Sequence, residues 1–277
     1  MSEWAQVGHQ DWCQVRLTPG QFVLDVHRCA KKLYTNFHEA ADYTALLLAQ
    51  EWGDRDLYLA LSGGSDSEYV ATALTRNNIK FTPYIFKIPG INDEESWYAE
   101  WWCRKNNTTP IVETVSLAYF QNNIWARYVP QLLNARLTGY VINLYVCDQI
   151  QKLNGYCITG VGDINLEHQT FFCDVVDFAG DLFRSGQHPS GFFMYTPEIA
   201  ASYLYQFDMS LDEQMNKMSF YQITPRPKFH IHNKLLDHNP KISAILKLRN
   251  KRNDLTNPHH YGTKLQTLDL LLGKTLE

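Results

Sequence analysis

At 277 residues, of which 45% are hydrophobic, the chain is long enough to bury a full core in one large domain or one domain with appendages. Its formal net charge of −4 gives no general attraction to phosphate backbones, so a nucleic-acid partner is not expected. No apolar run approaches the roughly 18 residues that a membrane helix needs, and the N-terminus has no secretory pattern. The sequence therefore predicts a soluble, cytoplasmic protein without a membrane partner.

The six cysteines lie far apart and form no CxxC pair of the kind that marks zinc sites or dithiol redox centres. We expect reduced thiols. Cys147 and Cys157 sit in apolar surroundings, which favours buried structural thiols over reactive ones.

The first part of the chain predicts a helical N-terminal segment. From about Gln21 to Trp52, apolar side chains recur every three or four positions, which is helical spacing. Gly53 and Asp54 then break the pattern, so we place the end of this segment at residue 54.

Strand-like and helical segments then alternate along the chain. The predicted strands are 57–61, 80–88, 110–116 and 156–160, and helical patterns lie between them, the second opened by Asn92 or Asp93 as its cap and the last spanning 119–153. This alternation predicts an α/β fold, a parallel sheet flanked by helices on both faces. We assign it residues 55–185. Six later prolines punctuate short helices, which predicts an irregular, mainly helical extension over 186–277.

The segment Ser62–Ser67, with the sequence SGGSDS, joins the first predicted strand to a helix. A Gly-Gly pair lets the backbone turn sharply and approach a ligand, while N–H groups at the following helix start point at one spot. Such a spot attracts phosphate. Ser62, Ser65 and Ser67 add hydroxyl donors, and Asp66 beside an anion indicates a Mg²⁺ ion between the two.

Rival motifs do not fit this loop. GxxxxGK[ST] is absent, GxGxxG does not follow the first strand, and GxSxG fails because Ser67 replaces its last glycine. The complete match to SGGxDS from Ser62 to Ser67 resembles the PP-loop ATP pyrophosphatases, a superfamily that includes asparagine, GMP and NAD synthetases. The resemblance covers roughly residues 55–165 and implies a Rossmann-like sheet of the HUP type.

In that family the loop holds the β and γ phosphates of ATP, which leave as pyrophosphate when a substrate oxygen attacks the α phosphate. A second nucleophile then displaces AMP. The resemblance implies ATP and Mg²⁺ as ligands and catalytic roles for Asp66 and Ser67. It also implies that the nucleotide phosphates contact Ser62, Gly63, Gly64, Ser65, Asp66 and Ser67.

A second turn, Thr159–Asp163 with the sequence TGVGD, ends the fourth predicted strand. It is similar to a Gly-rich turn of asparagine synthetases whose acid helps to hold Mg²⁺. The resemblance implies that Gly160 and Gly162 lie at the nucleotide and that Asp163 shares the metal with Asp66. A simple strand-ending turn, with Asp163 as a cap, explains the same residues.

The resemblance places adenine at the end of the second predicted strand, near Phe86 and Lys87, although core packing explains Phe86 equally well. Departing pyrophosphate needs positive charge, and we assign that catalytic role to Lys264. Other late basic residues are alternatives, each also explained as a solvated surface charge: Arg226, Lys228 and Lys234.

Three further groups have both a functional and an ordinary explanation. Glu94 and Glu95 open a helix, where they could contact substrate or metal or simply favour the helix dipole. The late histidine pairs lack a third ligand at zinc spacing. The basic run Lys247–Arg252 is expected to be a solvated helix face. It would bind nucleic acid only if it faced the active site.

Within the family, the loop and the TGVGD turn most resemble the synthetase domain of asparagine synthetase. Glutamine-using synthetases free ammonia with a catalytic cysteine, at the mature N-terminus or in a separate domain, and we expect neither here. The paired cysteines of sulfur-transferring tRNA enzymes are also missing from the sequence. We expect an AMP-forming ligase that activates a small carboxylate or amide, using free ammonia, another amine, or a partner chain that donates ammonia or sulfur. The alternatives are a non-catalytic ATP-binding subunit of a larger assembly and a nucleobase- or RNA-modifying enzyme.

Overall fold

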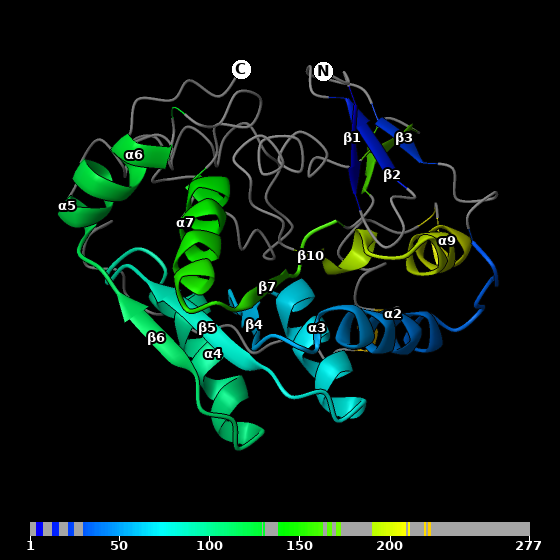
Figure 1. Ribbon diagram of the computed structural model, residues 1–277, viewed down its shortest axis with the longest axis horizontal. Helices are drawn as coiled ribbons and strands as arrows, with labels where there is room; N and C mark the ends of the chain where they lie inside the picture. The colour runs from blue at the N-terminus through cyan, green and yellow to red at the C-terminus, as the bar shows by residue number, and fades with distance from the viewer. Residues whose placement is uncertain are drawn as a thin grey trace.

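The computed structural model describes side chains over residues 30–128, 130, 139–162, 191–208, 210, 219 and 221–222. For residues 4–7, 13–16, 22–24, 138, 165–167, 170–172 and 190 it describes the backbone. Figure 1 shows the arrangement of the helices and strands.

A parallel sheet forms the centre of the molecule. Its strands are β4 (Leu57–Ala60), β5 (Thr82–Lys87), β6 (Ile111–Thr114), β7 (Tyr156–Thr159) and β10 (Ser190–Gly191). They lie in the order β10-β7-β4-β5-β6, and every neighbouring pair is parallel. The chain thus runs outward from β4 to β6 and then crosses back to the other side of β4. The predicted α/β fold is confirmed.

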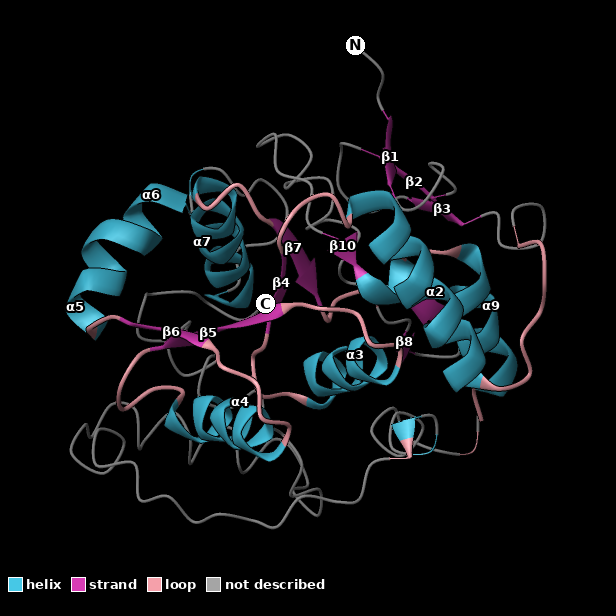
Figure 2. Ribbon diagram, turned by 60° about the horizontal axis from the view of Figure 1, so that its bottom comes forward, coloured by secondary structure: helices cyan, strands magenta, loops and turns pink. Residues whose placement is uncertain are grey.

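Helices cover both faces of this sheet, as Figure 2 shows. On one face lie α3 (Ser65–Arg76) and α4 (Asp93–Lys105), which follow β4 and β5. On the other lies α7 (Thr138–Lys152), which contacts β4, β5 and β7. The crossover before α7 begins with three short pieces, α5 (Leu117–Tyr119), the π-helical η2 (Phe120–Trp125) and α6 (Ala126–Tyr128), so the predicted helix over 119–153 is interrupted.

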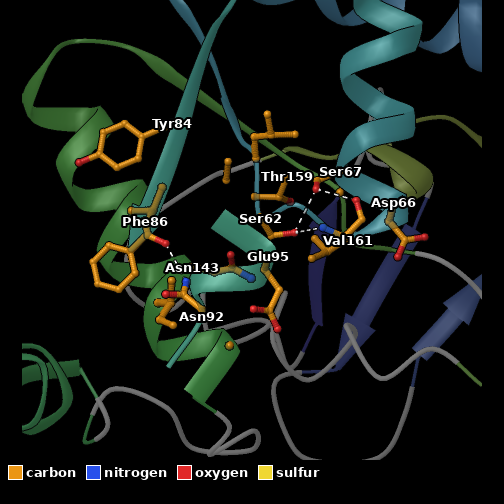
Figure 3. A pocket seen from close by; sticks show the side chains of 17 residues that line it. Ser62, Asp66, Ser67, Tyr84, Phe86, Asn92, Glu95, Asn143, Thr159 and Val161 are labelled. Carbon is orange, nitrogen blue, oxygen red and sulfur yellow. Dashed lines mark hydrogen bonds between the residues drawn. The ribbon is translucent and has the colours of Figure 1, made fainter. Parts of the chain in front are cut away.

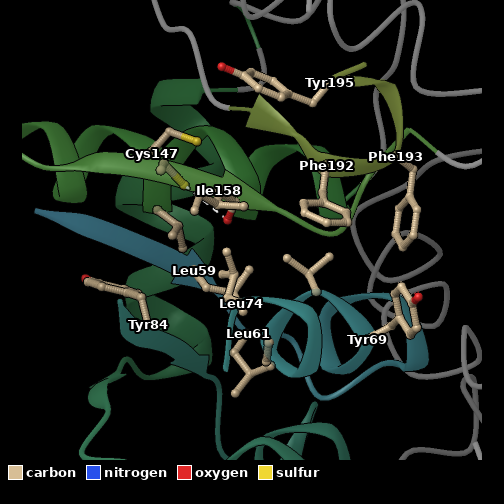
Figure 4. Close-up of a cluster of buried hydrophobic side chains, with 14 of the residues drawn as sticks. Leu59, Leu61, Tyr69, Leu74, Tyr84, Cys147, Ile158, Phe192, Phe193 and Tyr195 are labelled. Atoms are coloured by element: carbon tan, nitrogen blue, oxygen red, sulfur yellow. Dashed lines mark hydrogen bonds between the residues drawn. The ribbon is translucent and has the colours of Figure 1, made fainter. Parts of the chain in front are cut away.

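The core lies between the sheet and these helices (Figure 4). Leu59 and Ile158, on the two central strands, are fully buried, and Leu74 of α3 packs in the same cluster. Strands buried on both faces need apolar residues at successive positions, which explains the short apolar runs seen in the sequence. The expected burial of Cys147 and Cys157 is confirmed, since both are free thiols within this core.

The N-terminal segment differs from the predicted helix. Residues 22–24 form strand β3 (Phe22–Leu24), which pairs antiparallel with β2 (Cys13–Arg16), itself paired with β1 (Trp4–Val7). A short apolar run fits a strand as well as a helix, so spacing alone misled the prediction. The helix α2 (Phe37–Trp52) begins only after Asn36, whose side chain accepts the His38 N–H at 3.0 Å.

Packing crosses both of the domain boundaries that the sequence suggested. On the C-terminal side lie the 3₁₀ turn η4 (Phe192–Met194) and α9 (Pro197–Gln206), and α9 packs on α2. Strand β10 lies beyond residue 185 yet joins the main sheet. Between β7 and β10, β8 (Asn165–Glu167) and β9 (Thr170–Phe172) pair antiparallel. No described helix is long and apolar enough to cross a membrane.

Candidate functional site

The strand order creates a crevice at one edge of the sheet. After β4 the chain moves toward β5, whereas β7 lies on the opposite side of β4. Loops that leave two adjacent parallel strands in opposite directions leave a space outside their carboxyl ends, where ligands of such sheets bind. The loop after β4 is Leu61–Gly64 and the loop after β7 begins at Gly160, so both glycine-bearing segments open into this crevice.

A pocket of about 290 Å³ occupies the crevice (Figure 3). One end is lined by Ser62, Gly64, Asp66 and Ser67 of the first loop and α3, and by Thr159 to Val161 after β7. The other end is lined by Tyr84 and Phe86 from β5, which Figure 3 shows on the side away from Asp66. The pocket is therefore polar where α3 begins and apolar along β5.

The hydroxyl groups of Ser62 and Ser67 hold the first loop in a closed hydrogen-bonded ring. The Gly64 N–H donates to Ser62 Oγ at 3.2 Å, and Ser67 Oγ donates to the Gly64 carbonyl at 3.1 Å. The two Oγ atoms are 3.0 Å apart. Because a hydroxyl carries one proton, Ser62 is the donor in that last bond. Ser67 is only 4% exposed, and the two hydrogen bonds of its hydroxyl shape the loop.

Helix α3 starts at this loop without a side-chain cap. Its N-cap is Gly64, and the first intrahelical bond runs from the Glu68 N–H to the Gly64 carbonyl at 3.1 Å. The N–H groups ahead of Glu68 in a first turn have no carbonyl of their own helix to donate to. Together with the helix dipole, they make the polar end of the pocket favourable for an anion.

Gly63 allows the loop to pass very close to α4. Its φ is +87°, and a Cβ at this position would lie 1.9 Å from the Glu95 carbonyl oxygen. A residue with a side chain would meet backbone here and would also adopt a left-handed conformation that L-residues disfavour. Gly64, by contrast, has a φ of −74° and its nearest neighbour would be 3.4 Å from a Cβ. The two glycines therefore have different reasons to be present.

Gly160 brings the second predicted motif against the first. A Cβ here would lie 2.7 Å from the Ser67 backbone nitrogen and 2.8 Å from its Cα. The turn after β7 thus packs directly on the first turn of α3. Gly162, with a φ of +104°, serves a different contact: a Cβ there would lie 2.5 Å from Met194 Cγ, and the residue is not part of the pocket lining.

Asn92 fixes the loop between β5 and α4. It occupies the predicted N-cap position, but its side chain makes no cap hydrogen bond. Instead its Oδ1 accepts the Ile88 N–H at 2.7 Å and its Nδ2 donates to the Phe86 carbonyl at 2.8 Å. These two bonds hold the end of β5 against the pocket, and they occupy the Phe86 carbonyl.

The apolar end is neutral although it contains an ionisable ring. The Tyr84 hydroxyl donates to Glu113 Oε2, and Tyr145 of α7 donates to the other oxygen of the same carboxylate. Burial, followed by the hydrogen bond to Glu113, raises the pKa of Tyr84 well above its ordinary value. Tyr84 therefore presents an uncharged ring to the pocket at neutral pH.

The charged groups of the lining are both acids. Asp66 and Glu95 line the pocket, and among the residues that the structure describes there no lysine or arginine joins them. Within the same described residues, no group of three or more His, Cys, Asp or Glu side chains could hold a metal ion. Mg²⁺ usually binds through one or two carboxylates plus phosphate oxygens. The donor set thus fits a magnesium ion bound jointly with a phosphate ligand.

The structure separates the predicted site residues into three groups. Those in the pocket lining are Ser62, Gly64, Asp66, Ser67, Phe86, Glu95 and Gly160. Those outside the lining are Gly63, Ser65, Lys87, Glu94 and Gly162. Asp163 and Lys264, like the other late basic residues and the histidine pairs, lie outside the residues whose side chains are described, so their roles stay predictions.

Among the predicted residues that lie outside the pocket lining, Lys87 differs most clearly from its predicted position. Its Nζ lies 3.5 Å from Glu100 Oε1 of α4, and its carbonyl accepts the Val115 N–H at 2.9 Å. Alternate residues of a strand face opposite sides, so Phe86 at the pocket turns Lys87 toward α4. Of the two residues predicted to contact adenine, Phe86 lines the pocket and Lys87 does not, and the adenine contact stays a prediction.

One wall of the pocket was not predicted from the sequence. Gly139, Ile142, Asn143 and Val146 of α7 line it. They follow the spacing i, i+3, i+4, i+7, which defines a single stripe along a helix. That spacing was present in the sequence, but a stripe facing a pocket has the same spacing as one facing a core. Only the position of α7 over the sheet distinguishes the two.

The chain matches no protein-family model, and no curated protein matches it. Several solved structures show remote similarity, including these two. One is an NMN synthetase from Francisella tularensis, with a TM-score of 0.35 and 12% identity over 70% of this chain and 99% of that one. The other is a predicted subunit of tRNA methyltransferase from Methanocaldococcus jannaschii, with a TM-score of 0.33 and 14% identity over 61% of this chain and 87% of that one.

Proposed function

We propose that this protein binds ATP in the pocket between β4, β7 and α7 and cleaves it to AMP and pyrophosphate to activate an acceptor substrate. One observation carries the proposal: four residues of the SGGSDS segment, Ser62, Gly64, Asp66 and Ser67, line the polar end of a pocket at the carboxyl edge of a parallel sheet, between the two strands where the chain changes direction.

The polar end suits the phosphates that would leave. The first turn of α3 supplies backbone N–H groups and a helix dipole for the negative charge. Ser62, which is exposed, has a hydroxyl at this end that would donate to a phosphate in place of Ser67. Positioning and charge stabilisation at the leaving group are most of what phosphoryl transfer requires of a protein.

Magnesium would fit between the phosphates and Asp66. When bound, it neutralises charge that builds on the leaving pyrophosphate. Asp66 and Glu95 would otherwise repel a polyphosphate, which favours a bridging cation at this end of the pocket. Asp163 would be a second ligand and Lys264 a further source of positive charge, as the sequence predicts.

The apolar end suits a nucleobase. Phe86, Ile142 and Val146 offer apolar contacts, and Asn143 adds one amide that can both donate and accept. A mostly apolar wall with one polar group is the usual design of a small-molecule pocket. This arrangement favours ATP over an inorganic polyphosphate.

The proposed reaction has two steps. An oxygen of a small carboxylate or amide attacks the α phosphorus, the bond to the bridging oxygen breaks, and pyrophosphate leaves with the electron pair. Ammonia or an amine then attacks the activated carbon and AMP leaves. This is the chemistry of the asparagine synthetase type; the nitrogen would come from solution or from a partner chain.

The test is to identify the nucleotide products. The protein is incubated with Mg²⁺, ATP and a pool of small carboxylates, amides and amines, and the nucleotides are separated by chromatography. We expect AMP and pyrophosphate from the wild type and from Glu68→Gln, and none from Asp66→Ala. Glu68 is a matched control because it lies in the same first helical turn but outside the pocket lining.

Three other results would contradict the proposed reaction. ADP with phosphate would exclude cleavage between the α and β phosphates. Tight ATP binding without any product would support a nucleotide-holding subunit. Product formed only after RNA is added would indicate an RNA-modifying enzyme.

A further inference from the structure

Tyr221 contacts the proposed ATP loop from a distant part of the chain. Its hydroxyl donates to Asp66 Oδ1 at 2.7 Å, although the two residues are 155 positions apart. Asp66 lies in the first turn of α3 and lines the pocket. The segment that follows α9 therefore reaches the carboxylate that the proposed function assigns to magnesium.

The ring of Tyr221 is held in place by other aromatic residues. The side chain is only 4% exposed, and it stacks on Tyr69 with the ring centroids 4.4 Å apart and the planes 17° from parallel. Phe193 and Phe37 complete the cluster at 5.7 Å and 6.0 Å. A ring packed on three sides cannot swing away without breaking these contacts, so its hydroxyl is a donor at a fixed position.

Tyr69 explains why the hydroxyl meets Asp66. The two residues are three positions apart on α3, so their side chains lie on neighbouring parts of one helix face. A ring stacked on Tyr69 runs along that face toward the helix start. The aromatic cluster and the hydrogen bond therefore belong to one arrangement, with the ring as the anchor and the hydroxyl at its end.

The hydrogen bond restricts the orientation of the Asp66 carboxylate. The cap of α3 is Gly64, so Asp66 does not serve as its N-cap, and the hydroxyl ring of the loop runs through Ser62 and Ser67 instead. Oδ1 of Asp66 accepts from Tyr221, and a carboxylate has about four lone-pair sites, so this bond is compatible with metal ligation by the same group. Carboxylates that ligate metals are generally oriented by such partners, whose loss costs about 10- to 100-fold in metal affinity or activity.

We propose that Tyr221 is a positioning residue that orients Asp66 for Mg²⁺ and thereby completes the nucleotide site from the C-terminal side. This inference rests on the proposed function. The simpler explanation is that the hydroxyl of a buried tyrosine merely needs any acceptor. The two explanations differ in what removal of the hydroxyl does to magnesium-dependent binding.

Tyr221→Phe removes the hydroxyl and keeps the ring, and Tyr69→Phe is its matched control. Tyr69 belongs to the same stack and is equally buried, but its hydroxyl pairs with His38 Nδ1 at 2.8 Å. Both variants lose one buried hydrogen bond at the same aromatic cluster. Only the first loses the contact to Asp66.

The measurement is ATP binding by calorimetry, with Mg²⁺ and with EDTA, for the wild type and both variants. We expect Tyr221→Phe to weaken binding of Mg²⁺-ATP by about 10-fold or more. With EDTA, the wild type and Tyr221→Phe should bind ATP equally. Tyr69→Phe should match the wild type in both conditions, and melting temperatures should fall by similar amounts in the two variants.

Asp66→Asn, alone and combined with Tyr221→Phe, adds a second test. If the tyrosine acts through the carboxylate, the double variant binds Mg²⁺-ATP no more weakly than Asp66→Asn alone. Additive losses would overturn the inference, because they would show that Tyr221 acts by another route.

The binding measurements distinguish failure of this inference from failure of the proposed function. Unchanged or tighter Mg²⁺-ATP binding by Tyr221→Phe overturns the positioning role and leaves the proposed function standing. Absence of ATP binding by the folded wild type overturns the proposed function, and this inference with it.

Discussion

The two walls of the pocket are built in different ways. On the side of α3, the loop is fixed by backbone that touches backbone, at Gly63 beside Glu95 and at Gly160 beside Ser67. On the side of α7, the lining is a stripe of side chains on a regular helix, and its Gly139 has nothing within 4 Å of an added Cβ. The first wall tolerates no added atom at Gly63 or Gly160, whereas the second can exchange side chains. A fixed wall suits the constant part of a ligand, and an adjustable wall suits the part that determines specificity.

Gly63→Ala is expected to have the largest effect on this comparison. The new Cβ would overlap the Glu95 carbonyl and would require a positive φ, so we expect a loss of about 3 kcal/mol in the free energy of unfolding, or failure to fold. Urea denaturation followed by circular dichroism measures it. The neighbouring Gly64→Ala is the control, because its site has space and an ordinary φ. Equal destabilisation of the two variants would contradict the difference we infer.

Gly160→Ala should reduce both the stability of the fold and the binding of ATP. The Cβ would push the turn after β7 away from Ser67, and we expect a cost of about 1–3 kcal/mol together with loss of ATP binding. On the opposite wall, Gly139→Ala should raise stability slightly, by up to about 0.5 kcal/mol, because Gly139 lies in the first turn of α7 and alanine has the higher helix propensity. Thermal melting with and without ATP tests both. Destabilisation by Gly139→Ala would show that α7 is as constrained as the loop.

Asn143→Ala should change selectivity with little change in folding. Removal of one amide from the α7 wall is expected to weaken ATP binding by about 10-fold, the value of roughly one hydrogen bond of 1–1.5 kcal/mol. Binding of tripolyphosphate, which has no base, should stay unchanged. Competition titrations of the two ligands would measure this. An equal loss for both would place Asn143 at the phosphates instead.

The smallest expected effect concerns the buried thiols behind these walls. Cys147 lies on α7 and Cys103 on α4, and burial raises the pKa of Cys103 to about 11. A raised pKa keeps the thiol protonated, so native protein at pH 8 should react with iodoacetamide at neither position. Reactivity at Cys103 should appear only as the pH approaches 11 or the protein unfolds. Peptide mass spectrometry checks each site, and fast labelling of Cys147 alone would reveal that α7 opens independently.

The parts that could be predicted from sequence are those that local chemistry dictates. The apolar runs at Leu57–Ala60 and Tyr156–Thr159 predicted central strands because buried parallel strands need apolar residues on both faces. The SGGSDS segment predicted a strand-to-helix loop because only glycine permits its turn. Both depend on residues that are neighbours in the chain.

The parts that could not be predicted depend on distant contacts. The strand at Phe22–Leu24 has an apolar run that fits a helix equally well, and pairing with β2 decides the outcome. The stripe on α7 became a pocket wall only through its placement over the sheet. The contact of Tyr221 with Asp66 joins residues whose separation leaves no pattern in the sequence.

The packing of α2 on α9 has a consequence for the order of synthesis. Thr44 and Thr196 hydrogen-bond at 2.6 Å in the interior, across 152 residues, and Phe37 of α2 meets Phe193 and Tyr203. While the chain is being made, α2 leaves the ribosome long before its partner exists. The apolar part of α2 that α9 covers therefore stays exposed until residues near 206 have been synthesised and have left the ribosome. Nascent chains that stop short of that point should therefore bind chaperones or aggregate, and those that include α9 should escape both fates.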